Sequence, residues 1–425
     1  VEPRSSEVQE VTNPATNEVI AEFSPATQED ARLAVEAAQA AFPSWKDYPM
    51  RERARLLFDM RTKFEENVDQ LTRVLSQDHG RTIKESIGSV RRVIENIESA
   101  CSALYGLPKQ NEHLDQLANG IDQVLVWEPL GPFLIITPGN IPMHAWSSFV
   151  PYAMAAGCPV VVSPSRQDPV AAEIICRVAQ EAGFPPGVIN LIHGGRTINK
   201  YILDQPEIKG VGFIGSNRAG WELFAQCGQL GKTSSINGNG KNHVVIMPDA
   251  DLDQAVPWLL RACFGMTGQR CLGVDNIVIV GDRYEQVKET FVQAASSMRL
   301  GYGLDESTDM GPFTTDQGRQ NVLQWVEQAL SDGAKMLLDG RQVQVPDYPN
   351  GYFMGPTILG EAHVDMASSK EEAFGPVASL IRADSLDQVI EWINTKTNLG
   401  HSANIMTTNG IQARKFIREV NVGNV

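Results

Sequence analysis

The stretch Phe133-Leu134-Ile135-Ile136 begins the clearest repeating pattern in this sequence. Further short apolar runs follow it at Pro159–Val162, Val188–Ile192 and Val211–Ile214. Segments with the apolar spacing of amphipathic helices lie between these runs, at His144–Ala156, Asp168–Ala182 and Arg196–Leu203. This alternation is typical of βαβ units, whose parallel strands form a sheet with helices on both faces. We therefore expect ligands to bind at the carboxyl ends of these strands.

A second alternation of strands and helices begins after Lys241. Its expected strands are Val244–Met247, Ile277–Val280, Lys335–Leu338, Tyr352–Leu359, Val377–Ile381 and Ala403–Met406. Its expected helices are Leu252–Met266, Tyr284–Met298, Gln317–Ser331 and Leu386–Thr395. A chain of 425 residues also exceeds what one hydrophobic core usually supports. The sequence therefore predicts an α/β protein with two doubly wound parallel-sheet domains.

The segments before Phe133 predict a helical layer and a ribbon. Thr27-Gln28-Glu29-Asp30 has the pattern of a capping box at a helix start, and Arg51–Ser76 continues with helical spacing. Residues 110–129 are first polar and then alternate in polarity. We expect this last segment to form an exposed ribbon that pairs subunits.

Composition excludes several classes of protein. The formal net charge of −15 repels nucleic acid and anionic membranes. The six cysteines form no CxxC pair, so neither a disulfide framework nor a zinc site is indicated, and the histidines and acidic residues show no metal-binding spacing. No apolar run reaches 18 residues and no signal peptide is recognisable. We expect a reducing compartment, the cytoplasm or, in a eukaryote, the mitochondrial matrix.

Cys271 is the first candidate for chemistry. It ends the segment Gly265-Met266-Thr267-Gly268-Gln269-Arg270-Cys271, which we predict to close a helix. The glycines leave space for a ligand, and Arg270 favours the thiolate over the thiol. A small buried hydrophobe is the alternative interpretation, and it fits the other five cysteines, which lie in apolar patterns.

Asn140 follows the first strand in the turn Thr137-Pro138-Gly139-Asn140. A side-chain amide at this point can donate to a developing oxyanion, which preorganised donors stabilise by about 3 to 4 kcal/mol. The alternative is an Asx-turn that caps a proline-rich loop.

Two further loops could bind a cofactor. The segment Phe213–Gly220 contains a strand, a glycine turn and a helix start, an arrangement that can present free N–H groups to a phosphate, although an ordinary turn explains it equally well. Glu372 lies in an acidic loop before an expected strand, and a solvated loop is the alternative there.

These segments together resemble the aldehyde dehydrogenase family along nearly the whole chain. The resembling segments are Val11–Thr16, Thr137–Pro142, Phe213–Gly220, Gly268–Cys271, Glu372–Val377 and Asn421–Gly423. The resemblance implies that Cys271 is the nucleophile and that the Asn140 amide and the Cys271 N–H form the oxyanion hole. It also implies an NAD-binding site, with Glu372 at the nicotinamide ribose. The implied cofactor-binding residues are Thr137, Pro138, Ser163, Arg166, Gly215, Ser216, Gly220, Gly238, Glu372 and Phe374.

Asn237 bears on the acyl acceptor. Most of the family has a glutamate at this position, where it acts as the general base for thioester hydrolysis. An amide cannot accept a proton at neutral pH, so we expect a thiol, coenzyme A, to accept the acyl group. The surrounding residues resemble the CoA-acylating methylmalonate/malonate semialdehyde dehydrogenase branch, which oxidises a 3-oxo acid, releases CO₂ and uses two arginines. Arg270 and Arg92 match these arginines and would bind the substrate carboxylate.

The resemblance also implies domain boundaries, and two alternative functions remain open. It implies a Rossmann-like cofactor domain at residues 1–109 and 130–236, an oligomerisation ribbon at 110–129, a catalytic domain at 237–425, and a homodimer or homotetramer. A hydrolytic aldehyde dehydrogenase for another small-molecule aldehyde and a catalytically idle homologue remain the alternatives.

Three departures from the family pattern stand out. Ser163 and Arg166 replace a lysine and a glutamate that hold the adenine ribose, which makes NADP an alternative to NAD. Gly139 replaces an aromatic residue. Relatives also continue beyond the position of Val425, with residues that line the pocket and pair subunits.

Overall fold

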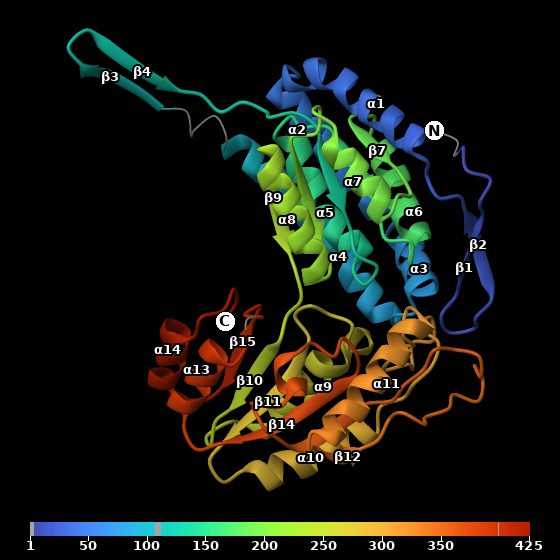
Figure 1. The fold of residues 1–425 in the computed structure, drawn as a ribbon, viewed down its shortest axis with the longest axis vertical. Coiled ribbons are helices and arrows are strands. Elements are labelled where there is room, and N and C mark those ends of the chain that lie inside the picture. The colour runs from blue at the N-terminus through green and yellow to red at the C-terminus, as the bar shows by residue number, and fades with distance from the viewer. Residues whose placement is uncertain (1–3, 107–111, 398) are drawn as a thin grey trace. The chain divides into compact units, whose positions relative to one another are not determined.

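The computed structural model of the protein describes residues 4–106, 112–397 and 399–425. The chain forms two compact units (Figure 1). The first unit is Val1–Thr12, Val19–Asp78 and Ser86–Asn237, and the second is Asn13–Glu18, His79–Glu85 and Gly238–Val425. The expected boundary at residue 109 and the first two residues of the expected ribbon lie outside the described residues.

The first unit contains a five-stranded parallel sheet. Its strands are β5 (Phe133–Ile136), β6 (Val160–Ser163), β7 (Ile189–Leu191), β8 (Gly210–Ile214) and β9 (Thr233–Asn237), in the order β7-β6-β5-β8-β9. The strand order reverses between β5 and β8, which is where doubly wound sheets bind ligands. The sequence pattern missed β9, because this edge strand is polar and alternates between exposed and half-buried residues.

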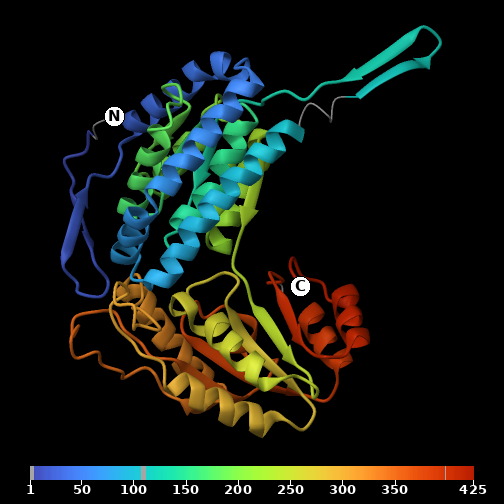
Figure 2. The same cartoon turned by 180° about the vertical axis from the view of Figure 1, so that it is seen from behind.

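Helices cover both faces of this sheet. They are α1 (Gln28–Lys46), α2 (Met50–Glu66), α3 (Val68–His79), α4 (Ile83–Gly106), α5 (Pro142–Ala155), α6 (Pro169–Gln180), α7 (Arg196–Asp204) and α8 (Asn217–Leu230). One apolar core joins a face of the sheet to α1, α7 and α8, and the other joins the opposite face to α2, α4, α5 and α6. Figure 2 shows α2 and α4 from behind, in blue and cyan. The expected continuous segment Arg51–Ser76 is broken at Asn67, which caps the end of α2.

Two small antiparallel ribbons complete the first unit: β1 (Gln9–Thr12) with β2 (Val19–Phe23), and β3 (Glu112–Ala118) with β4 (Ile121–Leu125). Every residue of β3 and β4 is exposed. Such a ribbon has no core of its own and is at best marginally stable in isolation. It corresponds to the segment that we expect to pair subunits.

The second unit contains a six-stranded sheet in the order β12-β13-β14-β11-β10-β15. Its strands are β10 (Asn242–Ile246), β11 (Val274–Val280), β12 (Lys335–Leu338), β13 (Thr357–Ala362), β14 (Val377–Ala383) and β15 (Ala403–Met406), and only the edge strand β12 is antiparallel to its neighbour. Its helices are α9 (Leu252–Phe264), α10 (Tyr284–Ser296), α11 (Asp316–Ser331), α12 (Ala367–Lys370), α13 (Leu386–Thr395) and α14 (Gly410–Glu419). The sheet is therefore a second α/β layer structure, and the predicted fold class is confirmed.

Two elements of this unit begin or end at other residues than the sequence predicts. The expected strand Tyr352–Leu359 begins only at Thr357, directly after Pro356, which has no N–H to donate to a ladder. The expected helix Leu252–Met266 ends at Phe264. In the described part of the chain no helix is long and apolar enough to cross a bilayer.

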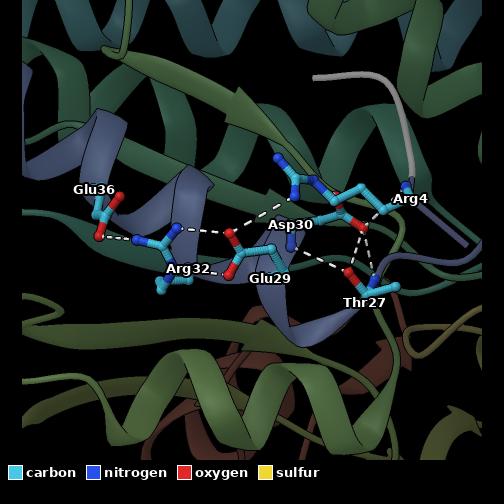
Figure 3. A network of polar contacts seen from close by, with 6 residues as sticks. All are labelled: Arg4, Thr27, Glu29, Asp30, Arg32 and Glu36. Atoms are coloured by element: carbon cyan, nitrogen blue, oxygen red, sulfur yellow. Dashed lines mark hydrogen bonds and ion pairs between the residues drawn. The ribbon is translucent and has the colours of Figure 1, made fainter.

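The start of α1 confirms the predicted capping box. The Thr27 hydroxyl oxygen accepts from the Asp30 N–H at 3.3 Å, and the Asp30 carboxylate accepts from the Thr27 N–H at 2.8 Å (Figure 3). Arg4 extends this network, because its guanidinium lies 3.8 Å from Glu29 and from Asp30. The bonds satisfy two donors that a helix start leaves unpaired.

Replacing Thr27→Ala removes this cap. We expect the free energy of unfolding to fall by about 1 kcal/mol, since loss of a threonine cap costs about that much. Urea denaturation measures the change. Thr62→Ala, at an exposed position inside α2, is the control and should change stability by less than about 0.5 kcal/mol. Equal losses in the two variants would contradict a capping role.

Candidate active site

The segment before Cys271 is a strained turn rather than the end of a helix. Met266, Thr267 and Gly268 have φ angles of 53°, 56° and 68°, so three successive residues adopt the left-handed conformation. Side chains make this conformation costly, by about 1 to 3 kcal/mol for each residue. The expectation that a helix runs up to Cys271 is therefore wrong, because the chain reverses its handedness after Phe264.

Polar contacts hold this turn in place. The Met266 N–H donates to a Glu85 carboxylate oxygen at 2.6 Å. The Thr267 hydroxyl donates to the Gly311 carbonyl at 2.9 Å. A Cβ at Gly268 would lie 1.9 Å from the carbonyl oxygen of Gly375, so only glycine fits there. The turn is consequently packed against the loop that carries Glu372.

Cys271 lies in a fixed loop between this turn and β11. The Asn242 amide donates from Nδ2 to the Cys271 carbonyl at 2.8 Å and to the Gly273 carbonyl at 2.6 Å. All six cysteines fall within the described residues, and Cys271 is the only one that is not buried. A partly exposed thiol on a rigid backbone suits a nucleophile that must meet a substrate.

Glu372 interacts with the loop before β10. Its carboxylate accepts from the Asn239 side-chain amide and from the Gly240 N–H, the latter at 3.3 Å. Burial, together with the nearby charge of Asp275, raises the pKa of Glu372 to about 7. Burial is also the main reason that the pKa of the Cys271 thiol is raised, and the negative charge of Glu372 raises it further. Arg270 opposes this change only weakly.

Lys241 and Asp275 form a buried charged pair that the sequence analysis missed. The Lys241 Nζ lies 3.9 Å from an Asp275 carboxylate oxygen and 5.3 Å from the centre of the Trp325 ring. Burial lowers the pKa of Lys241 and raises that of Asp275. The only signal in the sequence is the presence of single charged residues beside two apolar strands.

The candidate residues of the second unit share one edge of its sheet. Lys241 precedes β10, Cys271 precedes β11 and Glu372 precedes β14. These three strands are parallel neighbours in the order β14-β11-β10, so the residues gather at their amino ends. The candidate residues of this unit therefore lie at the edge opposite to the one that binds ligands in the usual doubly wound sheet.

The two candidate arginines have different surroundings. Arg270 is partly buried as a residue, and its guanidinium donates a long, exposed hydrogen bond of 3.4 Å to the Arg261 carbonyl. Arg92 lies on α4 in the first unit with 57% of its side chain exposed, and it forms an ion pair of 2.9 Å with Glu95.

In the first unit, Thr137–Asn140 follows β5 at the reversal of strand order. Thr137 is buried and donates its N–H to the Ser163 carbonyl at 3.3 Å, whereas Asn140 is partly exposed. A Cβ at Gly139 would lie 2.2 Å from the Gln167 side-chain oxygen. The Gln167 side chain therefore occupies the space beside Gly139.

The turn after β8 leads directly into α8. The Gly215 N–H donates to the Asn237 carbonyl at 3.0 Å, and Ser216 caps α8. A Cβ at Gly220 would lie 2.9 Å from the Ile236 side chain, so the glycine lets α8 pack closely on β9. The first turn of α8 contains no acidic residue, which leaves its positive end available to an anion.

A cavity of about 1020 Å³ lies beside α7 and α8. Its apolar lining includes Ile136, Phe213 and Leu223, and its polar rim includes Arg196, Asn199 and Lys200. A lining that mixes apolar and polar side chains is common in sites for small organic ligands.

Removing the charge of Glu372 should make Cys271 more reactive. In Glu372→Gln the thiol pKa falls, so alkylation by iodoacetamide at pH 8 should become faster by a factor on the order of three to ten. Mass spectrometry of the Cys271 peptide measures the rate. Glu371→Gln is the matched control, because Glu371 is exposed and should leave the rate unchanged. A slower reaction in Glu372→Gln would refute the electrostatic coupling.

Two doubly wound sheets, one beside a cavity and the other with a partly exposed thiol, are consistent with an α/β oxidoreductase. The model of the aldehyde dehydrogenase family matches residues 1–425, and the chain belongs to this family. The family predicted from the sequence is therefore confirmed.

Similar curated proteins include the mitochondrial methylmalonate-semialdehyde dehydrogenase [acylating] of Arabidopsis thaliana, which is 36% identical over 425 residues, or 100% of this chain and 69% of that protein. Malonate-semialdehyde dehydrogenase 2 of Geobacillus kaustophilus is 35% identical over 100% of this chain and 87% of its own length. Among solved structures, the methylmalonate-semialdehyde dehydrogenase of Oceanimonas doudoroffii has a TM-score of 0.96 at 33% identity and covers 99% of this chain and 86% of its own. A putative methylmalonate-semialdehyde dehydrogenase of Sinorhizobium meliloti, complexed with NAD, also has a TM-score of 0.96, at 32% identity over 100% of this chain and 86% of its own.

Proposed function

We propose that this enzyme oxidises methylmalonate semialdehyde or malonate semialdehyde and transfers the acyl group to coenzyme A. The observation that carries this proposal is Asn237, an amide at the position where most of the family has its hydrolytic glutamate. The names of the similar proteins, which are about 35% identical over the full chain, support the choice of substrate. A reducing compartment suits a reaction that depends on a free thiol.

Cys271 is the proposed nucleophile. Its sulfur adds to the aldehyde carbon, and the oxygen of the resulting thiohemiacetal carries the developing negative charge. In this proposal the Asn140 amide and the Cys271 N–H donate to that oxygen. The raised pKa of the thiol means that most molecules hold a protonated sulfur at neutral pH, so the proton must leave when the carbon–sulfur bond forms.

A bound nicotinamide dinucleotide supplies the hydride acceptor for the oxidation. In the proposal Gly215, Ser216 and Gly220 bind its pyrophosphate, while Glu372 binds the nicotinamide ribose. Thr137, Pro138, Ser163, Arg166, Gly238 and Phe374 are the remaining proposed contacts. The Glu372 carboxylate accepts one hydrogen bond on each oxygen, so it retains acceptor capacity for a ribose hydroxyl.

Water and the thiol of coenzyme A then compete for the acyl group of the Cys271 thioester. The Asn237 amide cannot remove a proton from water, so hydrolysis is slow. The thiol of coenzyme A attacks the thioester carbon, the bond to Cys271 breaks, and the cysteine recovers its proton. Arg270 and Arg92 are the proposed partners of the substrate carboxylate before it departs as CO₂.

Glu372 favours a second candidate function, that of a hydrolytic aldehyde dehydrogenase. Its carboxyl group is buried, interacts electrostatically with Cys271 and has a pKa of about 7, which is suitable for a general base. Its hydrogen bonds to Asn239 and Gly240 limit this role, because they stabilise the ionised carboxylate and lower its pKa.

Product analysis separates the two functions. With methylmalonate semialdehyde and NAD, we expect acyl-coenzyme A to form rapidly, and free acid to form at least about 100 times more slowly without the thiol, in keeping with the typical worth of a general base. Asn237→Glu should raise the hydrolysis rate, and Cys271→Ala should abolish turnover. Free acid at the full rate without coenzyme A would refute the acylating function, and loss of that activity in Glu372→Gln with unchanged NAD binding would assign it to Glu372. No turnover with any aldehyde or cofactor would indicate an idle homologue.

We further propose that the β3–β4 ribbon binds another copy of the chain. The ribbon and the residues after it expose a series of large apolar side chains, at Leu114, Leu117, Ile121, Val124, Leu125, Val126, Trp127 and Leu130. Contiguous apolar surface of this kind marks an interaction site. The ribbon also presents open strand edges, which favour strand addition.

Charged residues on the ribbon should weaken this assembly. We expect the wild-type chain to sediment as a dimer or tetramer and the double variant Val124→Lys, Val126→Lys to sediment as a smaller species, because burying a lysine between subunits is costly. Analytical ultracentrifugation measures the mass. Leu272→Lys, at an exposed apolar residue of the second unit, is a comparison variant that should keep the wild-type mass. An unchanged mass in the ribbon variant would contradict the proposal.

A further inference from the structure

The start of β11 contains a β-bulge at Asp275. The register of β10 against β11 skips this residue, because Val274 pairs with Asn242 and Asn276 pairs with His243. Asp275 is therefore an extra residue that opposes no residue of β10. Such bulges redirect a side chain and are frequent beside functional sites. This one lies at the amino end of the sheet, the edge that carries the candidate residues of the second unit.

The Asp275 carboxylate is buried among donors that come from neighbouring loops. The Lys241 Nζ lies 3.9 Å from it. The backbone N–H groups of Asn242 and Ala373 provide it with hydrogen bonds. Asn242 begins β10, and Ala373 directly follows Glu372 in the loop before β14. One carboxylate at the start of β11 therefore links the chain segments that precede β10 and β14.

Lys241 brings a buried positive charge to this carboxylate. The residue is 1% exposed, and among the described residues its Nζ has no hydrogen-bond partner. The distance of 3.9 Å to Asp275 allows attraction between the charges but is too long for a hydrogen bond. A buried charge is costly unless an opposite charge compensates for it. The two side chains therefore depend on each other, and removing either one changes the charge that surrounds the other.

Glu372 lies beside both members of this pair. Its carboxylate accepts from the N–H of Gly240, the residue before Lys241, at 3.3 Å. The N–H of Ala373, the residue after it, bonds to Asp275. Burial raises the pKa of Glu372 most, the negative charge of Asp275 raises it further, and the positive charge of Lys241 lowers it. The two members of the pair thus act on Glu372 in opposite directions.

The other titratable groups nearby do not change this balance. Burial lowers the pKa of His243 on β10 to about 3, so this side chain is neutral at physiological pH. Burial raises the pKa of the Cys263 thiol on α9, which is therefore also neutral. Glu371 is exposed, and Arg270 acts on the nucleophilic thiol itself. The buried pair is consequently the source of the charge that acts on Glu372.

From this arrangement we infer that Asp275 and Lys241 are positioning residues that set the reactivity of Cys271 through the charge of Glu372. A protonated Glu372 lets the thiol release its proton more easily, whereas an ionised Glu372 makes the thiolate less favourable. The bulge places the Asp275 carboxylate where it holds the Glu372 loop and opposes the charge of Lys241. This inference rests on the proposed function, in which Cys271 is the nucleophile, and it gives a role to two buried charges that the proposed mechanism does not use.

The pH profile of Cys271 alkylation tests the inference without turnover. Iodoacetamide reacts with the thiolate, so its rate rises with pH, and the ionisation of Glu372 should bend this rise near pH 7. In Asp275→Asn the bend should move to lower pH by about one unit, because Glu372 loses a negative neighbour and ionises more easily. In Lys241→Met it should move to higher pH by about one unit, because Glu372 loses a positive neighbour. Mass spectrometry of the Cys271 peptide measures the rate, using the whole chain without nucleotide.

Further variants separate charge from packing. Asp275→Glu keeps the negative charge and should keep the bend within about half a pH unit of its wild-type position. Glu372→Gln should remove the bend altogether. Asp282→Asn is the matched control, because Asp282 is an exposed aspartate just beyond the other end of β11, and it should leave the profile unchanged. A circular dichroism melt of each variant establishes that it is folded, and either folded single variant of the pair decides alone, since each predicts a shift of known sign.

Three results would overturn the inference. They are a wild-type profile without a bend, an unchanged bend in folded Asp275→Asn or Lys241→Met, and shifts of the same sign in both variants, which would indicate a general disturbance of the loop. None of these depends on substrate or acyl acceptor, so the inference and the proposed function fail separately. An enzyme that released free acid would still show the opposite shifts, and an acylating enzyme could lack them.

Discussion

The left-handed turn at Met266–Gly268 is the constraint on which the candidate site of the second unit depends. Two residues with side chains adopt a conformation that costs about 1 to 3 kcal/mol each, so the surrounding contacts must compensate for it. Glu85 supplies a hydrogen bond at 2.6 Å, and Gly268 approaches Gly375 so closely that no larger residue fits. The contacts that stabilise this strained turn also hold the loop of Cys271 against the loop of Glu372.

Burial is the second physical feature of the site, and it shifts the pKa values of both acidic and basic side chains. Lys241 and Asp275 are buried and Glu372 is partly buried, and burial is the largest influence on the pKa of each. Their mutual attraction and repulsion decide which of them are charged at neutral pH. The charge of Glu372 raises the pKa of the Cys271 thiol, so the reactivity of Cys271 depends on whether Glu372 is ionised. In the proposed mechanism the same carboxyl group also binds the cofactor.

The sequence predicted the fold where apolar patterns were strong and failed where tertiary contacts decide. The runs at Phe133–Ile136 and Ala403–Met406 became strands with the expected limits, because buried parallel strands are continuously apolar. The polar edge strand β9 left no such pattern. The turn before Cys271 was read as helix, since nothing local reveals that Glu85 and Gly375 stabilise a left-handed backbone. Lys241 and Asp275 were missed because their burial depends on the folded sheet.

The central claim is that Cys271 holds an acyl group which water releases slowly and a thiol releases rapidly. Mass spectrometry of the intact protein, mixed with methylmalonate semialdehyde and NAD and quenched at intervals, observes this intermediate directly. Our account predicts an acyl adduct on Cys271 that persists without coenzyme A and disappears within the mixing time when coenzyme A is added. An adduct on another residue, or one that is lost equally fast with and without the thiol, would contradict it.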